Sequence, residues 1–334
     1  MNKRKVGVLT SGGDAPGMNA AIRAVTRAGI NHGFEVFGIR RGYKGLMDGD
    51  IFQLRSEDVS GIIQTGGTFL QTARSKEFRE KEGRALAVEQ LKKFGIDSLV
   101  VIGGDGSFTG ANLLSQESHI NVIGIPGTID NDLYGTDYTI GYDTALNTVV
   151  EAVDKIRDTA NSHNRVFFVE VMGREAGFIA MNSCIACGAE VAIIPEEKNQ
   201  IEKLRNYLST RGDKKKSTII LVAEGAEEGN AMELAAKITP EFPQLDIRIS
   251  ILGHMQRGGS PSAKDRIAAS FMGIAAIEAL MDNQKSLMIG WKNEQPVHVP
   301  LNKVIKTHKG ISHEYVKQAE SISTFIPEEE QDQL

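Results

Sequence analysis

Short runs of apolar residues alternate with longer amphipathic stretches along the whole chain. We predict strands at 6–10, 35–39, 98–102, 121–125, 165–171, 191–195, 218–223 and 248–252. Several of these, such as 99–102 and 219–222, are apolar at every position, which is typical of parallel strands covered on both faces. The alternation therefore predicts an α/β fold with parallel sheets.

The longer stretches between the strands have helical periodicity. In the segment 144–160, apolar residues recur every three or four positions, and Asp143 is the expected N-cap. Residues 180–183 are mostly small and predict a second helix, which carries Cys184 and Cys187. A Cys-x-x-Cys pair could be redox-active or half of a zinc site, but no second pair is present, so we expect these cysteines to pack.

Composition narrows the possible partners and locations. A chain of 334 residues suggests two domains, and its 41% hydrophobic and 24% charged content is that of a globular protein. The net charge of −5 predicts no general attraction to nucleic acid or to an anionic membrane. No apolar run approaches the ~18 residues of a membrane span, the start is unlike a signal peptide, and two cysteines cannot build a disulfide framework. We expect a cytoplasmic protein with neither nucleic-acid nor membrane partners.

Glycines cluster where predicted strands end. Ser11-Gly12-Gly13-Asp14 follows the first strand and leads into a helix, while Gly103-Gly104-Asp105-Gly106-Ser107 follows the third strand and opens another. In open α/β sheets ligands bind beyond the carboxyl ends of strands, and glycine-rich loops at helix N-termini present amides to phosphate. The Asp105 carboxylate and the Ser107 hydroxyl suit phosphate with Mg²⁺. Either loop alone could also be a tight turn.

Two common nucleotide motifs are absent. The dipeptide Gly-Lys occurs nowhere, so the chain has no Walker A loop. The first loop lacks G-x-G-x-x-G spacing, and no acidic residue is placed to bind a ribose. A dinucleotide-dependent oxidoreductase is therefore disfavoured.

A third polar loop, Pro126-Gly127-Thr128-Ile129-Asp130-Asn131-Asp132, also follows a strand. Its two carboxylates at i and i+2 could divide the work of general base and metal support, although a surface Asx turn is the alternative. Arginines also stand near predicted strand ends, where their guanidinium groups could bind a phosphorylated ligand: Arg74, Arg165, Arg174, Arg248 and Arg257.

Five segments together resemble the bacterial ATP-dependent 6-phosphofructokinases: 9–18, 101–107, 126–132, 172–174 and 252–261. The resemblance extends from Val6 to about Pro261 and weakens toward the end. It implies two Rossmann-like three-layer α/β domains with mainly parallel sheets. The larger, ATP-binding domain would comprise 1–140 plus about 255–305, and the smaller, fructose 6-phosphate-binding domain 141–254 plus about 306–334.

The resemblance also implies the reaction. The family transfers a phosphoryl group from MgATP to the 1-hydroxyl of fructose 6-phosphate, which gives fructose 1,6-bisphosphate and ADP in the committed step of glycolysis. It implies Mg²⁺ as the cofactor and a homotetramer in the cytoplasm.

By matching motif, the resemblance assigns the nucleotide to one set of residues. Gly12 and Gly13 would cradle the γ-phosphate, Tyr43 would lie near adenine, and Asp105 would bind Mg²⁺. The complete set is Gly12, Gly13, Tyr43, Arg74, Ser75, Gly104, Asp105, Gly106 and Ser107.

A second set would hold the sugar and carry the chemistry. Asp130 would take the hydroxyl proton, Thr128 and Asp132 would support it, and Gly13 and Arg174 would stabilise the transferred group. The sugar-binding set is Thr128, Ile129, Asp130, Met172, Gly173, Arg174, Glu224, His254, Met255, Gln256 and Arg257, with Arg165 and Arg248 from a neighbouring subunit.

The phosphoryl donor can be argued at two positions. Pyrophosphate-dependent relatives carry an acidic residue at the Gly106 position and a lysine at the Gly127 position, whereas this chain has glycine at both. ATP is therefore favoured over pyrophosphate. A catalytically inactive sensor with this fold is a third reading, and the intact Asp105, Asp130 and Arg174 argue against it.

The family's effector pocket, which binds ADP or phosphoenolpyruvate between subunits, is matched only in part. Its matching residues are Arg23, Arg27, Arg157, Gly188, Glu190, Lys215 and Lys216. The chain departs from the pattern at Ser56, Asp213 and Ser217, where well-known members carry basic residues. Loss of cations weakens anion binding, so we expect reduced or altered regulation.

Overall fold

The structure, a computed structural model, describes residues 4–163, 165–210 and 217–322. The chain divides into two compact units, which are described separately: unit 1 is Met1–Thr144 with Arg257–Lys309, and unit 2 is Ala145–Gln256 with Gly310–Leu334. The division thus falls after Thr144, Gln256 and Lys309, against sequence-based boundaries at 140, about 255 and about 305. Throughout the described ranges, no helix is long and apolar enough to cross a membrane.

Unit 1 is built on a seven-stranded sheet with the order β11-β10-β5-β4-β1-β2-β3. The five inner strands run parallel, and the two edge strands, β3 and β11, are antiparallel to their neighbours. The strands are β1 (Lys5–Ser11), β2 (Glu35–Ile39), β3 (Ile51–Leu54), β4 (Ser98–Gly103), β5 (Asn121–Pro126), β10 (Leu287–Lys292) and β11 (Gln295–Pro300).

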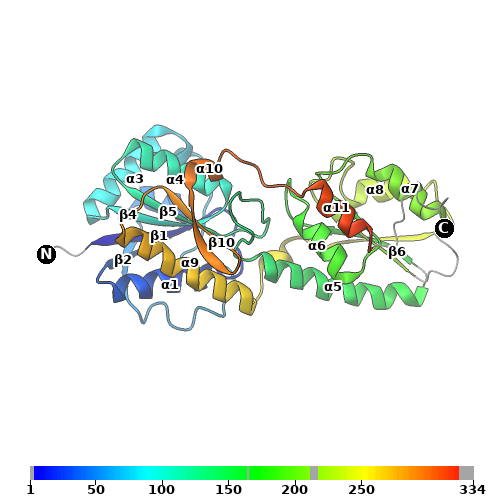
Figure 1. Cartoon of the computed structure of the whole chain (residues 1–334), viewed down its shortest axis with the longest axis horizontal. Coiled ribbons are helices and arrows are strands. Elements are labelled where there is room, and N and C mark those ends of the chain that lie inside the picture. Colours follow the sequence, from blue (N-terminus) through cyan, green and yellow to red (C-terminus); the bar gives the residue numbers. More distant parts are fainter. Residues whose placement is uncertain (1–3, 164, 211–216, 323–334) are drawn as a thin grey trace. The chain divides into compact units, whose positions relative to one another are not determined.

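Helices cover both faces of this sheet (Figure 1). One face carries α1 (Met18–Asn31) and α9 (Ala263–Met281). These two helices can approach closely because Gly273 has no side chain; a Cβ there would come within 2.6 Å of Ala24 Cβ. The other carries α2 (Gly42–Asp48), α3 (Lys81–Phe94), α4 (Asp105–Glu117) and α10 (Leu301–Val304), with a short 3-10 turn at Glu77–Arg79. Side chains of these four helices share one buried cluster with the strands, so unit 1 has three layers.

Unit 2 contains a four-stranded sheet of order β7-β8-β6-β9, and all of its pairings are parallel. The strands are β6 (Arg165–Val171), β7 (Val191–Ile193), β8 (Thr218–Ala223) and β9 (Asp246–Ile251). Helices α7 (Gln200–Thr210) and α8 (Ala231–Ile238) bury their apolar residues against one face. Helices α5 (Tyr142–His163), α6 (Phe178–Cys187) and α11 (His313–Glu320) complete the unit, and a 3-10 turn follows β9 at Gly253–Arg257.

All eight predicted strands are present, with small shifts at their ends. Three strands were not predicted: β3, β10 and β11. Strands β10 and β11 form a hairpin whose turn residues Asn293 and Glu294 both have positive φ. Turns of this kind usually contain glycine, and neither turn residue here is a glycine, so nothing in the sequence indicated the hairpin. The prediction that Asp143 caps the long helix is wrong, because α5 begins at Tyr142 and places Asp143 inside its first turn.

Candidate active site

The two glycine-rich loops of unit 1 follow neighbouring strands. Strands β1 and β4 pair in parallel with Ser11 opposite Gly103, so the loops that continue from them lie side by side. A Cβ at Gly103 would lie 2.5 Å from the Ser11 carbonyl oxygen, and Gly12 has φ +88°, close to the Ser107 hydroxyl. Glycine is required at both positions, which brings backbone amides close to any ligand bound here.

Helix α4 begins within the second loop, at Asp105. Its unpaired N-terminal amides and dipole favour an anion, and Gly106 faces open space in which a Cβ would meet no atom within 4 Å. The Asp105 carboxylate is exposed at this end of the helix. Partial burial raises its pKa above the ordinary value, and the nearby His308 counteracts this rise.

Other residues that we predict to bind the nucleotide lie next to these two loops. Tyr43 is only 6% exposed, stacks on Phe78 with ring centres 3.9 Å apart, and donates its hydroxyl to the Ser107 carbonyl. Burial raises its pKa strongly, so the hydroxyl keeps its proton and the hydrogen bond to α4 is maintained. The segment with Arg74 and Ser75 is tied to the first loop because Thr72 Oγ1 donates to the Gly12 carbonyl at 2.8 Å.

Arg257 also lies at the first loop. Its Nη1 donates to the Asp14 carbonyl oxygen at 3.3 Å, and a Cβ at Gly13 would come within 2.4 Å of the same nitrogen. A side chain at position 13 would therefore displace this guanidinium from its place in the loop. A fixed cation therefore lies directly beside the amides that face the expected phosphate position.

The third polar loop begins where β5 ends. Strand β5 pairs with β4, with Pro126 opposite Gly103, so all three loops leave the same edge of one sheet. A Cβ at Gly104 would lie 3.6 Å from Thr128 Cβ, which measures how close the second and third loops come. The structure thus brings the Asp105 and Asp130 loops together within unit 1.

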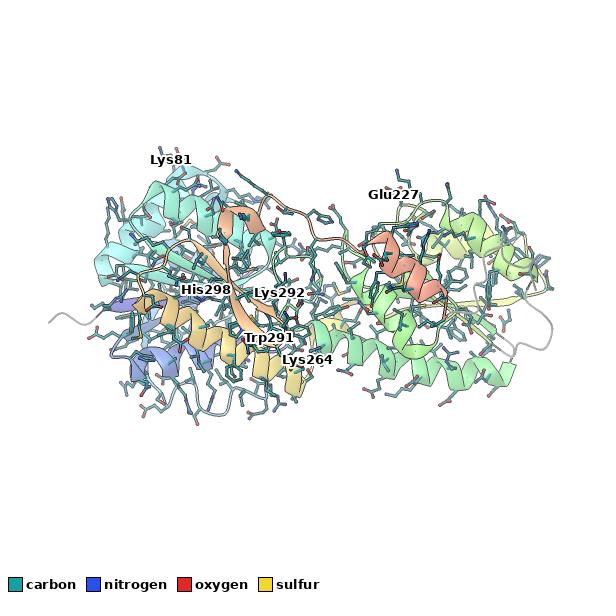
Figure 2. All side chains as sticks on the ribbon, in the orientation of Figure 1. Lys81, Glu227, Lys264, Trp291, Lys292 and His298 are labelled. Carbon is teal, nitrogen blue, oxygen red and sulfur yellow. The ribbon has the colours of Figure 1, made fainter. Side chains whose placement is uncertain are left out.

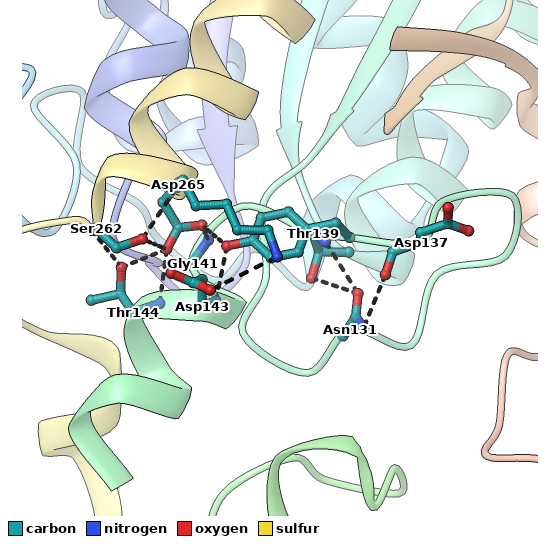
Figure 3. A network of polar contacts seen from close by, with 10 residues as sticks. Asn131, Asp137, Thr139, Gly141, Asp143, Thr144, Ser262 and Asp265 are labelled. Atoms are coloured by element: carbon teal, nitrogen blue, oxygen red, sulfur yellow. Dashed lines mark hydrogen bonds and ion pairs between the residues drawn. The ribbon is translucent and has the colours of Figure 1, made fainter. Parts of the chain in front are cut away.

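The third loop is buried rather than a surface Asx turn. Asp130 is 3% exposed and Asn131 is 4% exposed. Asn131 has φ +55°, a conformation that asparagine tolerates, and its side chain accepts from the Thr139 amide and donates to the Asp137 carbonyl (Figure 3). The Thr128 hydroxyl accepts from the Asp130 amide at 3.2 Å. The surface-turn alternative is therefore excluded.

In unit 2, predicted sugar-binding residues meet beyond the carboxyl ends of β6, β8 and β9. The Met172 amide donates to Gln256 Oε1 at 3.2 Å, and the Arg174 amide donates to Glu224 Oε1 at 3.0 Å. Gly173 (φ +139°) and Arg174 (φ +52°) both have left-handed backbones. The conformation is strained only for Arg174, which has a side chain, and strained residues are concentrated at functional sites, because surrounding contacts must hold them. His254 and Met255 are exposed in the turn after β9.

Arg165 begins β6, and Arg248 is the third residue of β9, opposite Phe167 of β6. Both pair with Asp246, whose oxygens lie 2.7 Å from Arg165 Nε and 2.9 Å from Arg248 Nε. The hydrogen bond from Arg165 is the main cause of the lowered pKa of Asp246. Arg165 begins β6 and Val171 ends it, so ~20 Å of strand separates Arg165 from the Met172 loop. Unit 2 therefore does not bring these arginines to its own cluster of sugar-binding residues.

The predicted effector residues occur in both units. In unit 1, Arg23 and Arg27 lie one turn apart on α1, and burial together with the charge of Arg27 lowers the pKa of Arg23. In unit 2, Arg157 donates to the carbonyls of Cys187 and Gly188 and lies 3.9 Å from Glu190. The matching residues Lys215 and Lys216 and the departing residue Asp213 lie outside the described residues.

The two cysteines behave as packing residues. Cys184 is buried, and its thiol contacts the Ala189 carbonyl at 3.4 Å. Burial raises the pKa of Cys184 to about 12 and that of Cys187 to about 11, so both remain thiols at neutral pH. No group of three or more His, Cys, Asp or Glu side chains that could hold a metal occurs in the described part of the chain.

Sequence reasoning missed several polar residues beside the three loops. Asp265, in the first turn of α9, is completely buried in a hydrogen-bond network. Lys309 donates to the Asp137 carbonyl, and burial lowers its pKa to about 8 despite the charges of Asp137 and Asp132. Their signal in the sequence is weak, because each side chain contacts a loop more than 100 residues earlier in the chain.

The chain is similar to known proteins over most of its length. The family model described as "Phosphofructokinase" matches residues 5–280. ATP-dependent 6-phosphofructokinase 2 of Bacteroides thetaiotaomicron is 58% identical over 319 residues, which cover 95% of this chain and 98% of the relative. ATP-dependent 6-phosphofructokinase 1 of Thermus thermophilus is 52% identical and covered to 99%, with 96% of this chain.

Solved structures show the same fold. Phosphofructokinase from Saccharomyces cerevisiae superposes with a TM-score of 0.84 at 40% identity, covering 91% of this chain and 45% of that longer chain. Pyrophosphate-dependent phosphofructokinase from Marinobacter aquaeolei gives a TM-score of 0.83 at 23% identity, covering 93% of this chain and 86% of that chain. The chain therefore belongs to the phosphofructokinase family, with its α/β fold of mainly parallel sheets.

Proposed function

We propose that the chain transfers the terminal phosphoryl group of ATP to the 1-hydroxyl of fructose 6-phosphate, giving fructose 1,6-bisphosphate and ADP. The observation that carries this proposal is the meeting of three loops at one edge of the unit 1 sheet. Two of them present glycine amides and a helix N-terminus, and the third holds a buried aspartate. The relatives that match this chain over nearly their whole length are named ATP-dependent 6-phosphofructokinases, which supports the same reaction.

The residues divide the reaction between positioning and charge. Phosphoryl transfer needs little covalent chemistry from the protein, so fixed amides and cations supply most of the stabilisation. Gly12 and Gly13 offer amides to the γ-phosphate, and Arg174 offsets the charge of the transferred group. Asp130 takes the proton of the 1-hydroxyl as general base, a role that typically contributes ~10²–10⁴ in rate.

The donor set fits a magnesium ion that comes with its nucleotide. Mg²⁺ usually binds one or two carboxylates and completes its shell with phosphate oxygens and water, so a cage of several carboxylates is not needed. Asp105, exposed at the start of α4 beside the open Gly106, is the ligand we assign. Bound there, the ion would neutralise charge on the phosphates.

ATP, rather than pyrophosphate, is the donor we propose. An acidic side chain at position 106 would enter the open space beside the α4 N-terminus and repel the α-phosphate of ATP; this chain has glycine there. A lysine at position 127 would have to displace Ile102 and Met18, which a Cβ would already meet at 3.0 and 3.1 Å.

Fructose 6-phosphate binding draws on unit 2. We assign the sugar to Met172, Gly173, Arg174 and Glu224, and its 6-phosphate to His254 and Arg257. Arg165 and Arg248 are assigned to the sugar phosphate of a neighbouring subunit, which is supported by their distance from the Met172 loop along β6. This assignment requires an oligomer, and we propose the family's homotetramer, acting in the cytoplasm, with weak responses to ADP and phosphoenolpyruvate.

A coupled assay tests the proposal directly. The purified chain is given fructose 6-phosphate and Mg²⁺ with either ATP or pyrophosphate, and formation of fructose 1,6-bisphosphate is followed through aldolase. We expect turnover with ATP and none above background with pyrophosphate. Turnover with pyrophosphate alone would reverse the donor assignment. Turnover with neither donor would contradict the proposed reaction and favour the alternative hypothesis of a catalytically inactive sensor.

A further inference from the structure

A buried carboxylate lies next to the three loops without belonging to any of them. Asp265 is 0% exposed, and its side chain collects hydrogen bonds from several donors (Figure 3). Oδ1 accepts from the Tyr138 hydroxyl at 2.9 Å and from the Gly141 amide at 2.6 Å. Oδ2 accepts from the Thr144 amide at 2.9 Å and from the Thr144 hydroxyl. One side chain therefore holds three residues of the segment 138–144.

This segment is itself fastened to the loop that carries Asp130. The Ile140 amide donates to the Pro126 carbonyl at 2.9 Å, and the Thr139 hydroxyl donates to the Thr128 carbonyl at 2.7 Å. The Thr139 amide donates to Asn131 Oδ1 at 3.1 Å. Residues 126–131 and 138–144 thus form one continuous hydrogen-bonded layer, with Asp265 at its end.

The network also includes the N-terminus of α9, the helix that carries Asp265. Ser262 caps the helix by accepting from the Asp265 amide, and its own amide donates to the Thr144 hydroxyl at 2.9 Å. The chain leaves unit 1 after Thr144 and re-enters it at Arg257, so the two segments next to these crossings are joined here. The exposed Lys264, labelled in Figure 2, lies beside the network. Its ammonium is 4.7 Å from the centre of the Tyr138 ring and 4.0 Å from Asp143 Oδ1.

We propose that Asp265 is a positioning residue for phosphoryl transfer. It fixes the segment 138–144, and through that segment the loop with Thr128, Asp130 and Asp132, while it also holds the start of α9 that follows Arg257. This inference rests on the proposed function, because it predicts an effect on that reaction.

The chemistry of the network explains why a carboxylate is needed. Burying a charge is costly, and burial raises the pKa of Asp265 while the hydrogen bonds from Thr144, Gly141 and Tyr138 lower it. An asparagine has the same shape, but its NH₂ group would face either the Gly141 amide or the Thr144 amide. A backbone N–H can only donate, so it cannot form a hydrogen bond with that NH₂ group. One buried backbone amide would therefore lose its acceptor.

The test compares Asp265→Asn with Asp282→Asn, the same change at the exposed C-terminal end of α9. Steady-state kinetics are measured at 15 °C, where circular dichroism establishes that each variant is folded. We expect Asp265→Asn to lower kcat at least ~10-fold with KM for ATP within ~2-fold of the parent, and Asp282→Asn to match the parent. A folded Asp265→Asn enzyme with parental kcat would overturn the proposal, even if its melting temperature fell.

If Asp265→Asn does not fold, the milder variant Tyr138→Phe tests the proposal instead. Tyr138→Phe removes one donor to Asp265 and leaves Oδ1 bonded to Gly141, and it also removes the acceptor of the Asp143 amide within the same segment. We expect a ~2–5-fold loss of kcat with the same unchanged KM for ATP, and a parental kcat overturns the proposal.

Hydrogen exchange separates this inference from the proposed function. If the parent does not phosphorylate fructose 6-phosphate, the proposed function fails, and the anchoring is then tested by amide exchange in 138–144. Faster exchange there in Tyr138→Phe than in Asp282→Asn supports the anchor, and equal exchange refutes it.

Discussion

Predicted site residues occur in two very different settings, the inner strands of unit 1 and the edge strand of unit 2. Every residue of β4 and β5 is buried, and each of these strands has a neighbour on both sides. Strand β9 lies at the edge of its sheet, and its Ile249 and Ile251 are 41% and 52% exposed. The polar loops after β4 and β5 are therefore held by contacts within unit 1, whereas Arg248 lies on a strand at the edge of the unit 2 sheet.

This difference predicts that the two regions control different kinetic constants. The Asp130 loop of unit 1 is held by hydrogen bonds within the unit, so it is ordered for the chemical step before substrate binds. The arginines of β6 and β9 have only Asp246 as a partner among the contacts described, and we assign them to a neighbouring subunit's sugar phosphate. Changes in unit 1 should therefore affect kcat, and changes on β9 should affect sugar affinity.

The largest effect is expected from Asp130→Ser. Serine removes the proton acceptor but keeps a small polar side chain in the buried loop, so kcat should fall at least ~100-fold while fructose 6-phosphate affinity changes little. Initial rates at saturating MgATP and isothermal titration with the sugar phosphate measure the two quantities. Asp282→Ser, on the exposed end of α9, is the control. A kcat near the parent's would remove Asp130 as the base.

Arg248→Ala should produce a smaller and different change. Loss of one charged hydrogen bond costs ~1.5–3 kcal/mol, which corresponds to a ~10–150-fold rise in the half-saturating fructose 6-phosphate concentration. We expect kcat and KM for ATP to stay within ~2-fold. Arg205→Ala, a paired arginine on α7 of the same unit, is the matched control and should leave all three constants unchanged. An effect confined to ATP binding would contradict the assignment.

The contrast between inner and edge strands also explains which strands and site residues could be predicted from the sequence and which could not. Strands β4 and β5 are apolar runs bounded by glycine or proline, so their existence and the ligand loops after them follow from local patterns. Strands β10 and β11 were missed because Gly290, Lys292 and Pro296 break the apolar pattern of a strand. Their conformation depends on pairing, of β10 with β5 and of β11 with β10. Asp265 could not be recognised either, because its donors lie more than 120 residues earlier.

Effector binding should be weak for a related reason. Ser56 supplies no cation, and the Ser217 hydroxyl is already hydrogen-bonded to Asn161 within unit 2. We expect ADP or phosphoenolpyruvate at millimolar concentration to shift the half-saturating fructose 6-phosphate concentration by less than ~3-fold. Ser56→Arg should enlarge the ADP response, and Ser60→Arg, four residues later on the same exposed segment, is the control. Strong responses of the parent at micromolar effector would contradict this expectation.

The smallest effect concerns Lys309, which ends the described part of unit 1 beside the Asp130 loop. Burial lowers its pKa from 10.5 to about 8, so between these values the unfolded chain binds more protons than the folded chain. The free energy of unfolding should therefore rise with pH in that window, by ~1–2 kcal/mol between pH 7.5 and 9.5. Above about pH 10 the raised pKa values of Tyr43 and Tyr138 act in the opposite direction, because the unfolded chain then releases more protons.

Urea unfolding of the parent, Lys309→Met and Lys306→Met across this range isolates the contribution of Lys309. Lys306 is exposed three residues earlier and serves as the matched control. The rise should disappear in Lys309→Met and persist in Lys306→Met. Parallel pH profiles for all three proteins would mean that Lys309 titrates as it does in the unfolded chain, and that the enclosure of the unit 1 loops does not extend to the segment after α10.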